Sequence, residues 1–229
     1  MFSVLFPGQG SQEVGMARDL YDKFDYVKDI FNQAEDVLNF SIKKLIFEGP
    51  KDLLNETENT QPAIFLVSYA IFMVIKKESR FDITSANFFA GHSLGEYSAL
   101  ACSEVLNFKN TIKLLKTRGN AMQNAVPNGE GGMMAVLGKS VEEITKILNE
   151  NSKNFSCFIA NDNTNGQLVI SGKLNNLKML SNELNLNNIK YVYLPVSAPF
   201  HCPLMKVATN TMEQIIIDTE FKDPFVEII

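Results

Sequence analysis

The chain has 229 residues, 45% of them hydrophobic and 21% charged, which is the balance of an ordinary globular protein with a sizeable core. Its formal net charge is -5 and it lacks long runs of like charge, which argues against nucleic acid or an anionic membrane surface as a partner. No apolar run in the sequence approaches membrane-spanning length.

The N-terminal half predicts two short strands and several helices. An apolar run over residues 3–6 is stopped by Pro7-Gly8-Gln9-Gly10, which predicts a buried strand that ends in a loop of small side chains. Because this start lacks the basic residues and long apolar stretch of a signal peptide, we interpret it as part of the fold. A second strand is predicted over 87–90, followed at once by a tight turn and a helix through about residue 102. Further helices are predicted over 20–38, 42–47, 61–75 and 108–125, with Thr60 as the N-cap of the third and Pro62 in its first turn.

The pattern changes after Pro127-Asn128-Gly129, a turn signal. Strands are then predicted over 132–137, 155–160, 167–171 and 189–194, and helices over 141–151 and 174–186. Strand, helix, strand, strand, helix, strand is the order of a ferredoxin-like unit. We therefore expect an α/β protein with a large domain over 1–127 and 196–229, built on a parallel sheet, and an inserted ferredoxin-like α+β subdomain over 128–195.

The segment Gly91-His92-Ser93-Leu94-Gly95 lies between a predicted strand and a predicted helix, and it fits the GxSxG pattern of a nucleophile elbow. In such an elbow the serine lies on a strained turn, and a side chain at either glycine would collide with a neighbouring strand or helix. The helix behind Ser93 would direct its N–H groups and its positive dipole end at the place where an oxyanion forms. The pattern predicts an α/β-hydrolase-like large domain with Ser93 as its nucleophile.

A serine hydroxyl needs a base to become a good nucleophile, and the chain has two histidines. His92 is next to Ser93 in the chain, but the backbone runs in a different direction at the two residues. We therefore expect His92 to be a packed, hydrogen-bonded neighbour. His201 lies in Pro199-Phe200-His201, where the small subdomain is expected to return to the large domain. We therefore predict that His201 is the base.

The cysteines Cys102, Cys157 and Cys202 are odd in number, widely spaced and without a CxxC pattern. This favours reduced thiols over a disulfide framework or a zinc site. We expect the cytoplasm, or an organelle lumen with reducing conditions, and no metal or organic cofactor. Cys202 is expected to be a packed thiol, because adjacent residues such as His201 and Cys202 rarely meet in hydrogen-bonding geometry.

Six blocks of sequence occur in a familiar order over essentially the whole chain. They are Pro7-Gly8-Gln9-Gly10-Ser11-Gln12, Thr60-Gln61-Pro62-Ala63, GHSLGEYSAL over 91–100, Thr117-Arg118-Gly119, Asn161 with Gly166-Gln167, and Pro199-Phe200-His201. In these blocks the chain resembles the malonyl-CoA:acyl carrier protein transacylases of fatty acid synthesis. Members of that family usually continue well past residue 229. We therefore expect that further large-domain strands, and a segment whose backbone carbonyl orients the histidine, lie outside this sequence.

The resemblance implies roles for individual residues. Ser93 would be acylated, with His201 as its base, and the backbone N–H groups of Gln9 and Leu94 would form the oxyanion hole. Arg118 would hold the free carboxylate of a malonyl group with two charge-assisted hydrogen bonds, which a planar guanidinium can do. The other substrate-binding residues that the resemblance implies are Gln61, Asn161 and Phe200, the last with a bulk that would disfavour an added methyl group.

The resemblance implies an [acyl-carrier-protein] S-malonyltransferase, with malonyl-CoA and acyl carrier protein as partners and neither nucleic acid nor a membrane. Two alternatives stay open. A serine esterase or thioesterase would share the elbow but would not need Arg118. A catalytically incompetent fragment would keep the motifs, and an open sheet edge with exposed apolar surface would cost it stability.

Overall fold

The computed structural model describes residues 1–127, 129–196 and 198–229. Their contacts divide the chain into two compact units, the first made of residues 1–120 and 212–229 and the second of residues 121–211. The predicted subdomain over 128–195 lies inside the second unit. The boundaries proposed for it stay a prediction.

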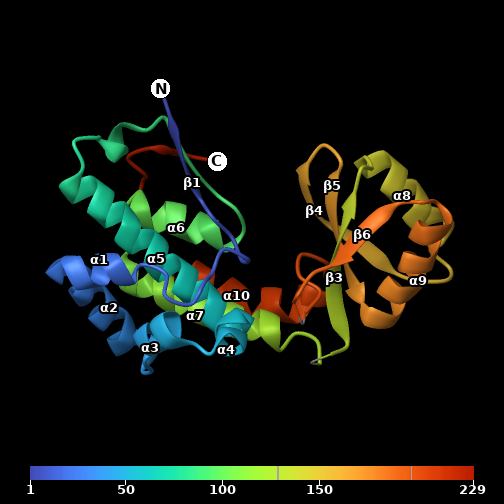
Figure 1. The fold of residues 1–229 in the computed structure, drawn as a ribbon, viewed down its shortest axis with the longest axis horizontal. Helices are drawn as coiled ribbons and strands as arrows, with labels where there is room; N and C mark the ends of the chain where they lie inside the picture. The colour runs from blue at the N-terminus through green and yellow to red at the C-terminus, as the bar shows by residue number, and fades with distance from the viewer. Residues whose placement is uncertain (128, 197) are drawn as a thin grey trace. The chain divides into compact units, whose positions relative to one another are not determined.

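The first unit is built on a parallel sheet in the strand order β1-β2-β7 (Figure 1). Its strands are β1 (Ser3–Phe6), β2 (Phe88–Gly91) and β7 (Glu227–Ile228). Ser3 lies opposite Phe88, and Phe89 lies opposite Ile228. The two strands predicted in the N-terminal half are therefore confirmed, and so is their parallel pairing.

Helices supply most of the first unit (Figure 1). They are α1 (Arg18–Lys23), α2 (Asp25–Leu38), α3 (Ile42–Glu48), α4 (Lys51–Asn55), α5 (Thr57–Glu78), the 3-10 turn η1 (Ile83–Ser85), α6 (Leu94–Cys102) and α7 (Phe108–Gln123). The central element is α5, whose Phe65 and Leu66 are fully buried. Among the described residues it is the one helix long and apolar enough to cross a membrane, but 61% of that stretch is buried inside the protein, as in a core helix.

The start of α5 differs from the prediction. The helix begins at Thr57, with Glu56 at the N-cap, so Thr60 is not its N-cap and Pro62 lies inside it. The Thr60 hydroxyl instead donates to the Leu54 carbonyl, 2.6 Å away. This bond, made within the buried junction between α4 and α5, satisfies the hydroxyl and lets the helix start one turn earlier.

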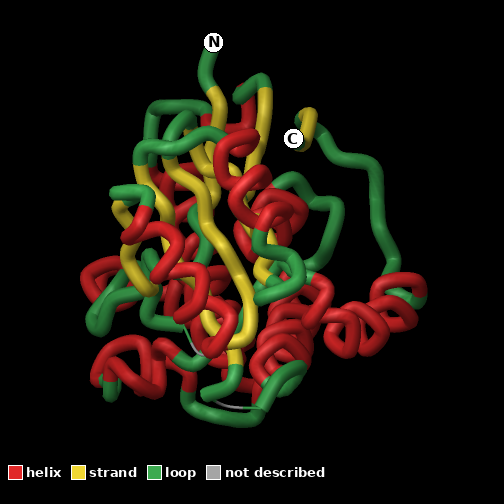
Figure 2. The backbone as a smooth tube through the Cα atoms, turned by 90° about the vertical axis from the view of Figure 1, so that its right-hand side faces the viewer, coloured by secondary structure: helices red, strands yellow, loops and turns green. Residues whose placement is uncertain are grey.

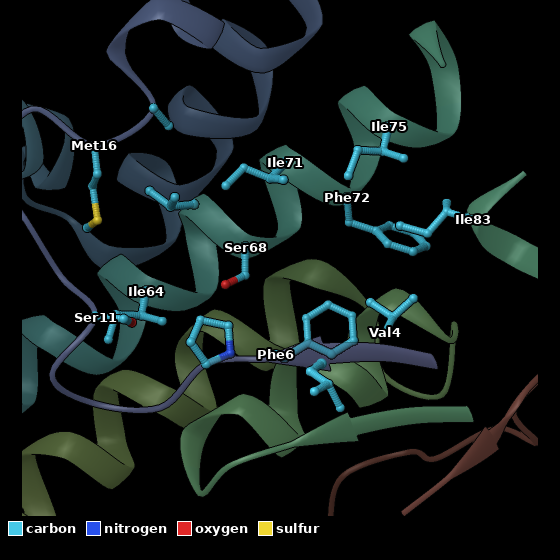
Figure 3. Close-up of a pocket in the computed structure, with 14 residues that line it drawn as sticks. Val4, Phe6, Ser11, Met16, Ile64, Ser68, Ile71, Phe72, Ile75 and Ile83 are labelled. Carbon is cyan, nitrogen blue, oxygen red and sulfur yellow. The ribbon is translucent and has the colours of Figure 1, made fainter. Parts of the chain in front are cut away.

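An apolar groove of about 380 Å³ lies between β1 and one side of α5. Figure 3 shows Ile64, Ile71 and Ile75 of α5 along this groove, with Phe6 of β1 opposite. Leu5 also lines it and is 76% exposed, and β1 is the edge strand of the sheet. This side of the first unit therefore exposes apolar surface next to a sheet edge.

The second unit is an antiparallel sheet in the order β4-β5-β3-β6. Its elements are β3 (Gly131–Leu137), α8 (Val141–Glu150), β4 (Cys157–Thr164), β5 (Gln167–Lys173), α9 (Leu174–Leu186), β6 (Lys190–Tyr193), the 3-10 turn η2 (Pro203–Met205) and α10 (Lys206–Ile217), the last of which continues to residue 217 of the first unit. The predicted succession of four strands and two helices is confirmed, and Figure 2 shows the same elements coloured by type.

The strands of the second unit bury both faces of their sheet. Met134 of β3 and Ile170 of β5 pack against α8 and α9 through residues such as Ile144 and Leu177. Because side chains alternate along a strand, their neighbours Met133 and Val169 point to the other face. There they pack in a second cluster, with Ala198, Phe200 and Met205.

Candidate active site

The nucleophile elbow is formed as predicted. Ser93 lies between β2 and α6 with φ 57° and ψ -108°, a conformation that residues with a side chain rarely adopt. A Cβ on Gly91 would overlap the backbone of Gly95, and one on Gly95 would overlap the carbonyl of Phe6 in β1. The prediction that both glycines are required by close approach to a strand or helix is confirmed. This main-chain packing fixes the position of the Ser93 hydroxyl.

The loop after β1 lies directly beside the elbow. The His92 N–H donates to the Phe6 carbonyl at 3.2 Å, and a Cβ on Gly8 would come within 2.7 Å of the His92 imidazole. The side chain of Gln9 donates to the Thr57 hydroxyl at 3.4 Å, which ties the loop to the start of α5. Leu94 is the first residue of α6, and the first N–H groups of a helix have no partner within it. Gln9 and Leu94 stay predictions as the oxyanion hole.

Arg118 lies on α7 and reaches Ser93. Its Nη2 donates to Ser93 Oγ at 3.1 Å, and its Nη1 donates to Gln61 Oε1 at 2.7 Å. Burial lowers the pKa of this guanidinium, because a charge is disfavoured away from water. Gln61 is itself 1% exposed, on the first half of α5. The first unit therefore brings together Ser93, Gln61 and Arg118, which are separated by up to 57 positions in the chain.

A glycine allows this meeting of α7 and α5. A Cβ on Gly119 would come within 2.6 Å of the Thr57 carbonyl oxygen and 2.7 Å of the Glu58 Cα. The backbone of α7 therefore touches the first turn of α5, directly next to Arg118. Any larger residue at position 119 would push the two helices apart and withdraw the guanidinium.

His201 lies on a turn of the second unit. It is exposed and has φ 55°, again a left-handed conformation for a residue with a side chain. The preceding Phe200 is 5% exposed, and its carbonyl accepts a hydrogen bond from the Ser171 hydroxyl at 2.5 Å. The ring of Pro199, two residues before His201, occupies the space that a Cβ on Gly131 would need. Ser197, which precedes this segment, is outside the described residues.

Two further residues of the second unit were singled out by the sequence. Asn161 is half-buried in β4 and lies opposite Val169 of β5. The register of these two strands shifts between Ile159 and Asn161. The side chain of Phe200 packs in the cluster on the sheet face away from α8 and α9. The structure gives each a place in the second unit, and their substrate-binding roles stay predictions.

The comparisons with known proteins agree with one another. Residues 4–229 match the family model of the acyl transferase domain. The malonyl CoA-acyl carrier protein transacylase of Bacillus subtilis is 37% identical over 227 residues, which cover 98% of this chain and 70% of the relative. The chain belongs to the acyl transferase family.

Other acyl transferases support the same assignment. The transacylase of Haemophilus influenzae is 40% identical over 95% of this chain and 71% of its own length. The crystal structure of an acyl-carrier-protein-S-malonyltransferase from Bartonella henselae superposes with a TM-score of 0.94 and 39% identity, over 100% of this chain and 73% of that one. A solved complex of a type II polyketide acyl-carrier protein with its malonyl-transacylase gives a TM-score of 0.93 and 37% identity, over 99% of this chain and 73% of that one.

The sequence of this acyl transferase did not reveal three residues that build the site. Thr57 anchors the Gln9 side chain, and Gly119 allows the helices to touch. The ring of Tyr97 on α6 lies 5.6 Å from the Arg118 guanidinium carbon. Position 97 follows Ser93 by one helical turn, which is the signal that could have identified the tyrosine as a neighbour of the site.

Burial disfavours ionisation of the thiols of Cys157 and Cys202. Burial raises the pKa of Cys157 to about 12, and it also raises the pKa of Cys202. The Cys202 thiol donates to the Pro199 carbonyl at 3.0 Å. Across residues 1–127, 129–196 and 198–229, no three His, Cys, Asp or Glu side chains gather in a way that could hold a metal ion.

Proposed function

We propose that this chain transfers the malonyl group of malonyl-CoA to the phosphopantetheine thiol of acyl carrier protein, as a step of fatty acid biosynthesis. The observation that carries the proposal is the position of Arg118, whose Nη2 lies 3.1 Å from Ser93 Oγ. Within the part of the chain that the structure describes, no carboxylate forms an ion pair with this guanidinium. A cation held beside a nucleophile suits an acyl group that carries its own negative charge.

The guanidinium has donors left for such a group. An arginine has five N–H donors in a planar fork, and two of these bind Gln61 and Ser93. Among the described residues these are the hydrogen bonds of its side chain, and two parallel N–H donors of such a fork match the two oxygens of a carboxylate. A simple esterase acting on an uncharged acyl group has no use for this arrangement. The proposal of a malonyl substrate therefore rests on charge and shape together.

In the proposed reaction, Ser93 Oγ attacks the thioester carbonyl carbon while His201 accepts the hydroxyl proton. The tetrahedral intermediate collapses by breaking the carbon–sulfur bond, and His201 returns the proton to the leaving thiolate of CoA. The phosphopantetheine thiol of acyl carrier protein then attacks the malonyl ester of Ser93, with proton transfers in the reverse order. Ser93 is regenerated and no net proton is consumed.

The charge that develops on the carbonyl oxygen needs hydrogen-bond donors. We assign these to the backbone N–H groups of Gln9 and Leu94, the latter at the positive end of the α6 dipole. One such donor is worth about 3 to 4 kcal/mol of barrier. Because the donors are main-chain groups, a change of the Gln9 side chain matters less than a change in the path of its loop.

The second unit supplies the remaining proposed groups, namely His201 as base with Phe200 and Asn161 as substrate-binding residues. We propose no acidic residue beside Ser93 and His201. A backbone carbonyl would therefore set the tautomer of His201. The Gln61 side-chain oxygen accepts a hydrogen bond from Arg118, which supports a role for Gln61 in holding the carboxylate-binding group.

We also propose the finer description of the fold. The parallel sheet with its elbow supports an α/β-hydrolase-like large domain over 1–127 and 196–229. The strand order β4-β5-β3-β6, with all pairs antiparallel, supports a ferredoxin-like subdomain over 128–195. The buried, unpaired thiols of Cys102 and Cys157 fit the proposed location in the cytoplasm or a reducing organelle lumen.

The test is intact-protein mass spectrometry after brief incubation with malonyl-CoA, with acetyl-CoA in parallel and Ser93→Ala as the control. We expect one malonyl adduct that is absent from Ser93→Ala and that disappears when acyl carrier protein is added. Steady release of free malonate without carrier protein would instead identify a thioesterase. A folded protein that forms no adduct would contradict the proposal for this chain.

A further inference from the structure

Two hydrogen bonds leave one motion of the Arg118 guanidinium unrestrained. The bonds to Gln61 and Ser93 both lie along N–H directions of the fork, at 2.7 and 3.1 Å, and so act within the guanidinium plane. They do little to stop the plane from tilting about the line that joins the two acceptors. A carboxylate bound by two parallel N–H groups requires that this tilt be fixed.

The aromatic group that lies beside the guanidinium is the ring of Tyr97. The Arg118 guanidinium carbon lies over this ring, 5.6 Å from its centroid. At this distance the negative face of an aromatic ring attracts a cation, and the attraction grows as water is excluded. The ring therefore adds an attraction for the guanidinium to the two hydrogen bonds with Gln61 and Ser93.

The fold holds the ring of Tyr97 in place by packing. Tyr97 lies in the first turn of α6, which begins directly after Ser93, so both residues lie at the same end of the helix. The ring is half-buried and packs against a cluster of Leu106, Leu114 and Met212. Burial raises the pKa of its phenol, although the nearby guanidinium opposes the rise, so the ring stays neutral at physiological pH.

We infer that Tyr97 is a positioning residue for substrate specificity, whose ring face holds the Arg118 guanidinium in the plane from which it binds the carboxylate of the acyl group. The inference rests on the proposed malonyl transfer and adds a residue to it. Tyr97 itself touches neither the acyl group nor the reacting atoms. Its loss would weaken the preference for an acyl group with a free carboxylate over one without it.

The experiment measures acylation of Ser93 by mass spectrometry, with malonyl-CoA and acetyl-CoA, in variants of position 97. Tyr97→Phe keeps the ring, and we expect it to keep the malonyl-to-acetyl ratio within about twofold, whereas Tyr97→Met, which fills similar space without a ring face, should lower the ratio about tenfold. The loss should appear mainly as a higher half-saturating concentration of malonyl-CoA. Tyr69→Met is the matched control, because it removes a half-buried ring that packs on Phe65 and Phe108 in the same unit.

A second series of variants tests the inference even if Tyr97→Met does not fold. Phenylalanines with one, two or three ring fluorines, placed at position 97, keep the shape of the ring while they remove negative charge from its face. We expect the malonyl-to-acetyl ratio to fall with each fluorine. A ratio that stays constant across the series, in proteins with unchanged melting temperature, would overturn the inference. Absence of any malonyl adduct on the unmodified chain would instead overturn the proposed function, so the two failures are distinguishable.

Discussion

Two turns carry the proposed catalytic pair, and they are held by different means. Ser93 and His201 both have positive φ, 57° and 55°, although neither is glycine. The Ser93 turn is fixed by main-chain contacts, because the backbones at Gly91 and Gly95 approach their neighbours too closely for any side chain. The His201 turn is fixed by side chains, through the buried Phe200 and the hydroxyl of Ser171.

The difference predicts different tolerance to mutation. A turn built on main-chain contact cannot relax without moving a strand, so a small change there disrupts the unit. A turn held by packed side chains and by hydrogen bonds of side chains, such as those of Ser171 and Cys202, can shift while the sheet beneath it stays intact. Four substitutions test this contrast, and they follow in order of decreasing expected effect.

Gly95→Ala should be the most damaging change. The added methyl group overlaps the Phe6 carbonyl of β1, so we expect a loss of about 3 kcal/mol or more in the free energy of unfolding, together with loss of acylation. Denaturant unfolding and the malonyl adduct assay measure the two effects. Gly172→Ala is the control, since its nearest neighbour is the Cys157 sulfur at 3.2 Å and its loss should be smaller. Equal stability of the two variants would contradict the main-chain explanation.

Arg118→Gln should leave the fold intact and reduce the preference of Ser93 for a malonyl over an acetyl group. Because the charged partner of the carboxylate is lost, we expect malonylation of Ser93 to slow about 100-fold, while acetylation changes by much less. Single-turnover acylation with the two CoA esters measures the ratio. Arg80→Gln, which changes an exposed arginine, is the control. A parallel loss of both reactions would show that Arg118 acts on Ser93 and not on the acyl group.

Ser171→Ala should weaken the second turn without breaking it. The buried Phe200 carbonyl loses its donor, which costs about 1–3 kcal/mol and lowers the melting temperature by about 2–4 °C per kcal/mol. We expect acylation to slow about tenfold as His201 shifts. Ser181→Ala is the matched control, because its hydroxyl bonds a carbonyl within α9. If both variants acylate at the rate of the unmodified chain, the hydroxyl of Ser171 does not position the histidine turn.

Cys202→Ser should have the smallest effect. A serine hydroxyl can replace the thiol as donor to the Pro199 carbonyl, so the malonyl adduct should form at a rate within about twofold of the unmodified chain. Burial raises the pKa of Cys202, so less of the thiol is ionised at pH 8 than in a free cysteine. Alkylation by iodoacetamide at that pH should therefore be slower than for glutathione. Loss of the adduct in Cys202→Ser would revive the cysteine as a candidate nucleophile.

Local sequence predicted the elements with fair accuracy and their boundaries less well. The strand, turn and helix around Ser93 were predicted because glycine spacing and an apolar run act over a few residues. The N-cap of α5 was predicted wrongly, because Thr60 fits the local pattern of a cap while its hydroxyl finds a partner in Leu54. A cap is decided by which acceptor the folded chain brings near, and that information is not local.

The sequence by itself determined the nucleophile turn, the order of the strands and helices along the chain and, through its motifs, the resemblance to a family. Only the tertiary structure decided what surrounds the serine. It brings Gln61 and Tyr97 to Arg118, and it makes Gly119 the point where α7 touches α5. These contacts join different helices, so the packing of the core determines them and no local pattern of residues records them.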